Sequence, residues 1–172
     1  MTIPSVLKKT LASVVIVYVT LVVVMLLLTT GSAIAVEIDE SIRTVPLNNN
    51  GMQTTLSLNQ LALGRQKFNN SCAQCHLDGG SKTNPDVDLS TETLALATPP
   101  RNSIESIVNY LNEPTTYDGV TSLAAFHPST LEPEIFPIMQ SLSEDDLSAI
   151  AGYILTQPRI VGQQWAGGKP KR

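Results

Sequence analysis

The chain has 172 residues, of which 42% are hydrophobic and only 15% charged, and its formal net charge is −4 at pH 7. This length suits a single globular domain and excludes a multidomain enzyme. With only two cysteines there is no disulfide framework, and the lack of clustered cations excludes nucleic acid as an expected partner.

The amino-terminal segment has the parts of a secretory signal peptide. Two lysines precede an uncharged run over residues 11–30, in which 16 residues are hydrophobic. The run leads to Gly31-Ser-Ala-Ile-Ala35, whose small residues suit a signal peptidase. We predict cleavage after Ala35, which removes residues 1–35 and leaves residues 36–172 as an exported mature protein. The alternative is an uncleaved anchor, because about 20 apolar residues can cross a hydrocarbon layer about 30 Å thick.

The first elements of the mature chain are predicted to be a hairpin and a helix. Residues 43–47 and 52–56 have a β pattern and flank an Asn-Gly turn, which predicts a short hairpin. Ser57 and Gln60 have the spacing of a capping box, so a helix should follow and run to about Asn70. Its apolar face is expected to carry Leu58, Leu61 and Phe68.

A loop rich in Gly, Asp, Asn and Ser follows the cysteines, and a helical turn is predicted over residues 91–97. The next helix should start at Asn102 or Ser103 as its N-cap and end before Pro114. It is predicted from apolar residues recurring at i, i+3, i+4 and i+7, which are Ile104, Ile107, Val108 and Leu111.

Residues 115–137 contain or adjoin several prolines and are predicted to be a wrapped loop. Ser143 and Asp146 then open a last helix, which should end at Pro158. Its expected apolar face consists of Leu147, Ile150, Ala151, Ile154 and Leu155. The basic, glycine-rich tail over residues 167–172 is typical of a disordered terminus.

The chemistry of the chain is expected at Cys72-Ala-Gln-Cys75-His76, which has the C-x-x-C-H pattern of covalent haem attachment. Two thiols one helical turn apart can both add to the vinyl groups along one edge of a porphyrin. The next residue, His76, can then direct its imidazole toward the iron. One haem c, bound covalently to Cys72 and Cys75, is therefore the predicted cofactor.

Three alternative chemistries fit the motif less well. A thioredoxin-like redox pair needs a βαβ context, which the surrounding pattern does not have. A zinc site needs about four ligands, and the adjacent Cys75 and His76 are poorly placed to share one tetrahedral ion. A disulfide across two residues would be strained and would give His76 no role.

The second axial ligand of the iron has two candidates. His127 is the only other histidine of the chain and precedes Pro128, which favours an extended loop conformation. Met139 lies in a proline-bounded segment and could ligate the iron instead. The sequence pattern favours neither. A methionine would raise the reduction potential, whereas a second histidine would lower it.

From Val45 to Gly168 the chain resembles the cytochrome c-550 family, extrinsic subunits of photosystem II in cyanobacteria and red algae. The resemblance rests on the haem motif and on long matching segments: Lys82-Thr-Asn-Pro85, Leu89-Ser-Thr-Glu-Thr-Leu-Ala-Leu-Ala-Thr-Pro-Pro-Arg101, Pro114-Thr-Thr-Tyr-Asp-Gly119, His127-Pro-Ser129, Ile135-Phe-Pro137 and Trp165-Ala-Gly-Gly168.

The resemblance implies a mainly α, monohaem, class I-like cytochrome c with a short N-terminal β-hairpin, in which His76 is the proximal and His127 the distal iron ligand. It also implies that five residues line the haem pocket, namely Thr83, Asn84, Leu94, Tyr110 and Tyr117.

The function implied by the resemblance is that of a low-potential haem protein rather than an enzyme. Such a protein binds the lumenal surface of the photosystem II core beside other extrinsic subunits, as a peripheral protein of the thylakoid membrane. There it stabilises the manganese-calcium cluster and helps retain calcium and chloride. The alternatives are a soluble electron-carrier cytochrome c, in the lumen or the periplasm, and a diverged paralogue. One departure concerns docking, because family members usually end in two tyrosines, whereas this chain ends in Lys169-Pro-Lys-Arg172.

Overall fold

The computed structural model describes residues 5–28 and 38–168, which belong to two units, Met1–Glu37 and Ile38–Arg172. In the first unit, helix α1 (Ser5–Leu28) covers most of the predicted signal peptide. The predicted cleavage site at Ala35 lies outside the described residues. Among the described helices, none is both long enough and apolar enough to cross a membrane.

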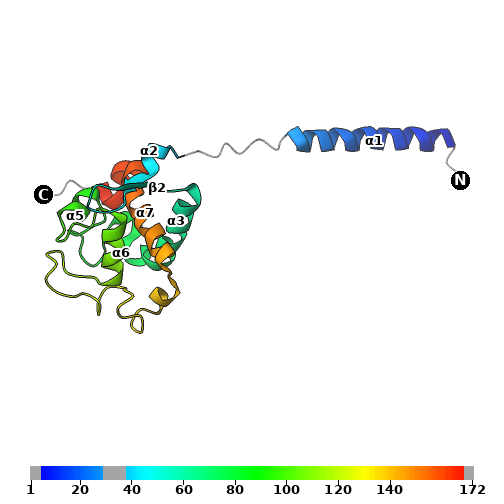
Figure 1. The fold of residues 1–172 in the computed structure, drawn as a ribbon. Coiled ribbons are helices and arrows are strands. Elements are labelled where there is room, and N and C mark those ends of the chain that lie inside the picture. Colours follow the sequence, from blue (N-terminus) through cyan, green and yellow to red (C-terminus); the bar gives the residue numbers. More distant parts are fainter. Residues whose placement is uncertain (1–4, 29–37, 169–172) are drawn as a thin grey trace. The chain divides into compact units, whose positions relative to one another are not determined.

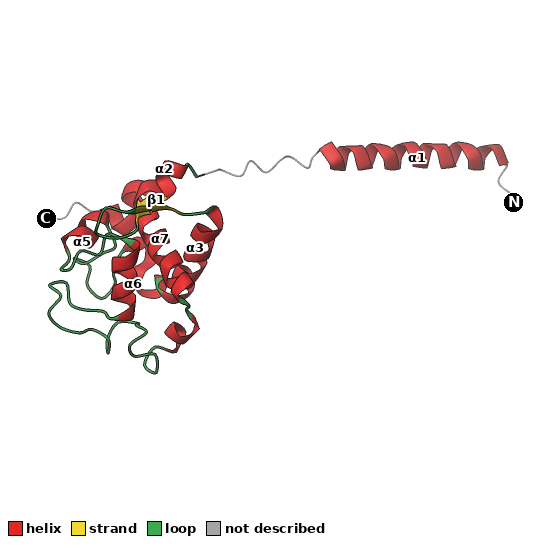
Figure 2. Ribbon diagram, in the orientation of Figure 1, coloured by secondary structure: helices red, strands yellow, loops and turns green. Residues whose placement is uncertain are grey.

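The second unit is mainly helical, as predicted, and its single described sheet has two strands (Figure 1; Figure 2). Its elements in chain order are α2 (Glu40–Arg43), β1 (Thr44–Pro46), β2 (Gln53–Thr55), α3 (Leu58–Ser71), α4 (Ala73–His76), the 3₁₀ turn η1 (Leu77–Gly79), α5 (Thr91–Leu96), α6 (Ile104–Asn112), η2 (Pro137–Ser141), α7 (Glu144–Val161) and η3 (Gly162–Gly168).

The predicted hairpin is confirmed, with shorter strands than the sequence pattern suggested. β1 and β2 pair in antiparallel register, with Thr44 opposite Thr55 and Pro46 opposite Gln53. The turn depends on Gly51, whose φ of 85° is a left-handed conformation that glycine adopts without steric cost. The Val45 side chain is fully buried, so this small sheet covers part of the hydrophobic core.

Helix α3 begins where the capping box predicts, because Ser57 Oγ accepts the Gln60 N–H and Gln60 Oε1 accepts the Ser57 N–H. Leu61 and Phe68 are buried, as predicted, but Leu58 is wrong as a core residue and is exposed. Leu58 is the first residue of the helix and is 44% exposed.

Helices α3 and α7 approach closely, and α6 packs on the other side of α7 (Figure 1). Gly64 of α3 makes this approach possible, since a Cβ there would lie 2.0 Å from the Ala149 carbonyl oxygen. The α6 residues predicted to form its apolar face, Ile104, Ile107, Val108 and Leu111, are all buried. The three helices therefore enclose the main hydrophobic core.

Helix α7 starts at Ser143 as predicted, but the predicted end at Pro158 is wrong, since the helix continues to Val161. Arg159, one residue after the proline, donates hydrogen bonds to the carbonyls of Ser41 and Thr44. These tertiary bonds hold the last turn in place although Pro158 cannot donate a helical hydrogen bond. Gly162, with φ at 58°, ends the helix.

The described structure continues beyond α7 and includes the first two residues of the predicted tail over residues 167–172. Residues 162–168 form η3, and Trp165 within it is buried against Phe68 and Tyr153, at ring-centroid distances of 5.8 and 5.9 Å. Burial of a large aromatic side chain outweighs the low order expected from the flanking glycines. Residues 169–172 lie outside the described part of the chain.

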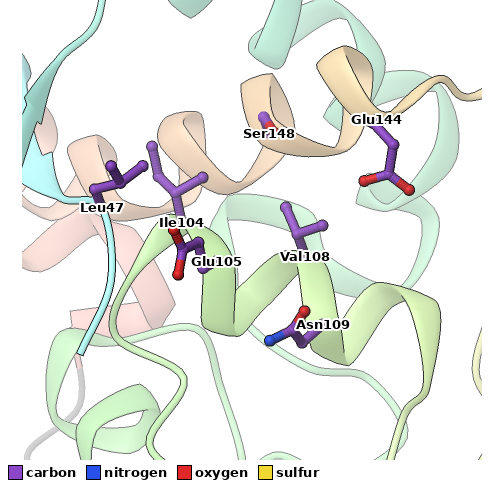
Figure 3. A pocket seen from close by; sticks show the side chains of 7 residues that line it. All are labelled: Leu47, Ile104, Glu105, Val108, Asn109, Glu144 and Ser148. Carbon is purple, nitrogen blue, oxygen red and sulfur yellow. The ribbon is translucent and has the colours of Figure 1, made fainter. Parts of the chain in front are cut away.

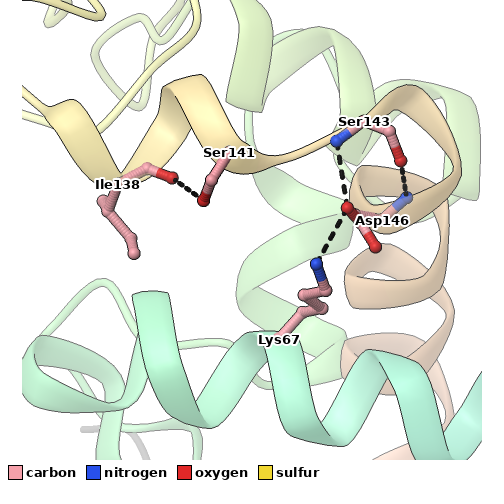
Figure 4. Close-up of polar contacts among 5 residues, drawn as sticks. All are labelled: Lys67, Ile138, Ser141, Ser143 and Asp146. Atoms are coloured by element: carbon pink, nitrogen blue, oxygen red, sulfur yellow. Dashed lines mark hydrogen bonds and ion pairs between the residues drawn. The ribbon is translucent and has the colours of Figure 1, made fainter.

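An ion pair joins α3 to the start of α7. The Lys67 ammonium lies 3.0 Å from Asp146 Oδ2, and the same carboxylate accepts the Ser143 N–H in the capping box (Figure 4). The hydrogen bonds from Ser143 and from Lys67 hold the pKa of Asp146 below its ordinary value of 3.8. A carboxyl group whose pKa is lowered on folding adds stability at pH values above its unfolded pKa and loses it as the pH falls through its folded pKa.

We expect Asp146→Asn to lower the free energy of unfolding by about 1 kcal/mol at pH 7, because the cap is weakened and the ion pair is lost. The difference from the parent protein should shrink as the pH falls below 3.8. Urea titrations of the variant and the parent protein, at pH 7 and at a pH below 3.8, measure this difference in the free energy of unfolding. Asp145→Asn is the matched control, since Asp145 is an exposed neighbour, and an equal loss in both variants would contradict the role of the ion pair.

Candidate haem site

The Cys72-x-x-Cys75-His76 motif forms one turn at the junction of α3 and α4. Cys72 ends α3, and its carbonyl accepts the N–H groups of Cys75 at 3.1 Å and His76 at 2.9 Å. Both cysteines are free, Cys72 half-buried and Cys75 exposed. The turn places the thiols one helical turn apart with His76 next in line, which is the geometry expected for haem attachment.

The thiols do not have the character of a redox pair. Burial, with a smaller effect from Cys75, raises the pKa of Cys72 to about 12, whereas a redox-active thiol needs a lowered pKa. The described sheet is a two-stranded antiparallel hairpin, so the motif has no βαβ unit beside it. These observations argue against the thioredoxin-like alternative.

The segment after the motif turns sharply and is covered by Trp165. Asp78 and Gly79 both adopt positive φ, 51° and 78°, which reverses the chain. A Cβ on Gly79 would lie 2.4 Å from Trp165 Cε2, so only glycine allows the indole to pack here. Trp165 Nε1 also donates to the Leu89 carbonyl at 2.9 Å. The C-terminal η3 segment thereby fixes the backbone on which His76 sits.

The His76 ring is oriented by its own loop. Its Nδ1 lies 3.0 Å from the Gly80 carbonyl oxygen, which can only accept, so Nδ1 carries the proton. Nε2 is then the nitrogen with a free lone pair for a metal. Burial lowers the pKa of His76 and favours this neutral form.

His127 is held in the same way on the long loop between α6 and η2. Its backbone N–H bonds the Leu123 carbonyl at 2.8 Å, and its Nδ1 lies 2.9 Å from the Pro128 carbonyl oxygen. Burial, followed by the charge of His76, lowers the pKa of His127 to about 4. His127 also has a protonated Nδ1 and an available Nε2.

The ring centroids of His76 and His127 are separated by a distance that suits one iron atom between the two rings. Their ring centroids are 6.2 Å apart with an interplanar angle of 50°. A metal–imidazole bond is about 2 Å long and the ring centre lies about 1 Å behind the bonded nitrogen, so two ligands on opposite sides of one metal have centres about 6 Å apart. The side chains present therefore fit an axially ligated haem iron.

Met139, the other candidate for the distal position, lies in η2 and is only 4% exposed. Its side chain belongs to the hydrophobic core that contains Leu111 and Leu147. The structure pairs His76 with His127 in a ring contact, which favours histidine as the distal ligand.

The five residues that the resemblance places around the haem occupy different environments. Tyr110 contacts His127 edge-on at a centroid distance of 5.0 Å. Leu94 is buried in the core, and the Tyr117 hydroxyl donates to the Thr93 carbonyl at 2.8 Å. Thr83 and Asn84 are exposed on the loop after the motif. Tyr110 is thus the member that the structure joins directly to a predicted ligand.

Sequence reasoning missed Arg101, a buried cation beside these groups. Its guanidinium carbon lies 4.0 Å above the centroid of the Tyr110 ring. Its Nε is buried and has no hydrogen-bond partner among the described residues. A buried donor without a partner fits a site that receives an acceptor from a bound group, such as the carboxylates of a haem. The only sequence signal was a single arginine after Pro99-Pro100.

A separate surface hollow lies between α6 and the first turns of α7 (Figure 3). The carboxylates of Glu105 and Glu144 and the polar groups of Asn109 and Ser148 line it, over an apolar base that includes Val108. None of the predicted haem ligands lines this hollow, so it is distinct from the haem site.

Comparisons with known proteins show the family to which the chain belongs. The sequence profile of a family described as "Cytochrome c-550 domain" matches residues 36–172. A relative from Nostoc punctiforme named "Photosystem II extrinsic protein V" is 55% identical over 139 residues, which are 81% of this chain and 85% of the relative. The crystal structure of cytochrome c549 is 52% identical, with a TM-score of 0.73, and the match covers 74% of this chain and 99% of that one. The PsbV2 cytochrome of Thermosynechococcus elongatus is 29% identical, with a TM-score of 0.60 over 72% of this chain and 87% of that one.

Proposed function

Because the chain belongs to the cytochrome c-550 family, we propose that it binds one haem c through thioether bonds to Cys72 and Cys75, with His76 and His127 as axial ligands. The observation that carries the proposal is the facing pair of histidine rings, 6.2 Å apart, each with its Nδ1 engaged by a backbone carbonyl. When bound, the haem supplies a one-electron redox centre. The protein supplies orientation, burial and exclusion of water.

Two imidazole ligands imply a low reduction potential, because imidazole is a stronger donor than a thioether and stabilises ferric iron. They also fill both axial positions, so no open coordination site remains for a substrate. The proposed protein is therefore a haem protein that does not turn over a substrate. The covalent haem links α4 to the 115–137 loop through its ligands and stabilises the fold.

The proposed role is that of an extrinsic subunit on the lumenal side of photosystem II, which supports the manganese-calcium cluster and its retention of calcium and chloride. The name of the Nostoc relative and its 85% coverage support this role. The predicted signal peptide supports export to the lumen. A diverged paralogue is less well supported, since identity to the PsbV2 cytochrome is 29% against 55% for the Nostoc relative.

The surface of the chain favours attachment to a basic partner. Residues 102–158 contain eight carboxylates and neither lysine nor arginine, and all of these carboxylates except the buried, ion-paired Asp146 are exposed or partly exposed. The loop in this segment exposes large apolar side chains, with Val120 80% and Phe126 83% exposed. A segment that combines carboxylates with exposed apolar side chains suits a peripheral contact with a basic protein surface, and such a contact weakens at high ionic strength.

We expect a concentrated salt wash of oxygen-evolving membranes to release this protein and to lower oxygen evolution, which rebinding of the purified protein should restore. The salt screens the proposed contacts between the acidic surface and its partner. Haem staining of a denaturing gel identifies the released chain, because a covalently bound haem survives denaturation. A variant lacking both cysteine thiols, with Cys72 and Cys75 replaced by Ala, is the staining control.

Two outcomes would contradict separate parts of the proposal. If the chain is washed off without any change in oxygen evolution, it is a soluble electron carrier rather than a subunit. If the released chain has no haem stain and shows no Soret absorbance, the haem assignment is wrong whatever its partner.

A further inference from the structure

Arg101 is a cation fixed in the interior, with an exposed fraction of only 7%. Its Nη2 donates to the carbonyls of Thr115 at 3.0 Å and Thr116 at 2.7 Å. These two residues begin the loop that carries His127, and that loop is also tied to α6 by the bond of 3.2 Å from the Thr130 N–H to the Leu111 carbonyl. Arg101 therefore anchors the root of the distal loop.

The same guanidinium reaches His127 through one aromatic ring. Its carbon lies 4.0 Å from the Tyr110 centroid, and the Tyr110 ring meets His127 edge-on, at 5.0 Å and an interplanar angle of 66°. The cation is thus within about 9 Å of the distal imidazole, a distance at which buried charges still interact appreciably.

We propose that Arg101 is a positioning residue for the distal ligand, which holds Tyr110 and the 115–130 loop against His127 and raises the reduction potential of the haem through its buried charge. This inference rests on the haem proposed above. It assigns a role to Arg101 that does not follow from the identity of the two axial ligands.

The electrostatic part follows from charge and burial. A fixed positive charge near the iron disfavours the ferric state, which carries one more positive charge than the ferrous state. An iron bound by His127 would lie about 3 Å beyond the centre of its ring, and thus up to about 12 Å from the guanidinium. At about 12 Å and an effective dielectric constant of about 20, this effect is roughly tenfold in the ratio of ferrous to ferric protein.

The mechanical part follows from the hydrogen bonds. An arginine can bond two successive carbonyls and lie flat on an aromatic ring, whereas a lysine provides a point charge without that planar geometry. A lysine at position 101 should therefore retain most of the electrostatic effect and lose much of the anchoring of the loop.

The test uses the full holoprotein with its haem attached and compares Arg101→Gln, Arg101→Lys and Arg159→Gln. Arg159 is the matched control, because it also bonds two backbone carbonyls but is exposed. Two quantities are measured: the midpoint potential, and the rate at which cyanide displaces the distal ligand of the ferric protein.

We expect Arg101→Gln to lower the ferrous-to-ferric ratio at fixed ambient potential about tenfold, which is 59 mV for a one-electron couple. Arg101→Lys should shift the potential by less than half as much, yet bind cyanide several-fold faster than the parent. Arg159→Gln should change neither quantity.

Equal potential shifts in Arg101→Gln and Arg159→Gln would overturn the electrostatic part. If Arg101→Gln yields no folded holoprotein, the test depends on Arg101→Lys. Cyanide binding to this variant at the parental rate would refute the positioning role. A parent protein that carries no haem would refute the proposed function instead, so the two failures are distinguishable.

Discussion

Replacing His127 by Met should raise the reduction potential of the haem by on the order of 0.1 V or more, since axial ligands set haem potentials over a range of about 0.8 V. The reason is that a thioether donates less electron density to iron than an imidazole and so favours the ferrous state. Redox titration of the holoprotein, followed by its visible absorbance, measures the change.

The matched control is Met139→Leu, which changes the other candidate ligand in a volume-conserving way. Because Met139 is packed in the core, this variant should keep the parental potential and lose at most about 1 kcal/mol of stability. The reverse pattern, with the potential altered by Met139→Leu and unaffected by His127→Met, would identify Met139 as the iron ligand.

The two proposed axial ligands were predictable from the sequence to different degrees. His76 follows from the C-x-x-C-H spacing, because local chemistry on a single turn determines it. His127 does not follow from local pattern, since a loop histidine before a proline and a methionine in another loop are equally plausible. What distinguishes them is that the 115–130 loop returns to α6, through the Thr130 N–H to Leu111 carbonyl bond of 3.2 Å. A tertiary contact of this kind between a loop and a helix leaves no periodic pattern in the amino-acid sequence.

The starts of α3 and α7 were predictable, because each depends on a capping side chain within three residues. The capping boxes at Ser57 and Ser143 both form in the structure. The misjudged features depend on partners far along the chain. The last turn of α7, which was wrongly predicted to end at Pro158, is held by bonds from Arg159 to Ser41 and Thr44. Arg101 could not be predicted as part of the site, because a single arginine forms no sequence pattern. Only the fold brings it over Tyr110.

Replacing Gly64 by Ala should lower the free energy of unfolding by about 3 kcal/mol, although alanine has the higher helix propensity. A Cβ at this position would lie 2.0 Å from the Ala149 carbonyl oxygen and 2.9 Å from Tyr153 Cβ. The first contact is with the backbone of α7, which no rotamer change can relieve. Helices α3 and α7 would have to separate, and the packing of Phe68 against Tyr153, now at a centroid distance of 5.2 Å, would loosen.

Gly80→Ala provides the comparison, because a Cβ there would come no closer than 3.4 Å to the Leu77 carbonyl oxygen, and the backbone φ of −70° suits any residue. This variant should stay within about 1 kcal/mol of the parent, and both are measured by urea unfolding of the holoprotein with circular dichroism. A Gly64→Ala protein as stable as Gly80→Ala would mean that α3 and α7 are not in backbone contact. The orientation of the haem motif, which follows directly from the end of α3, would then have to be set by contacts other than those between α3 and α7.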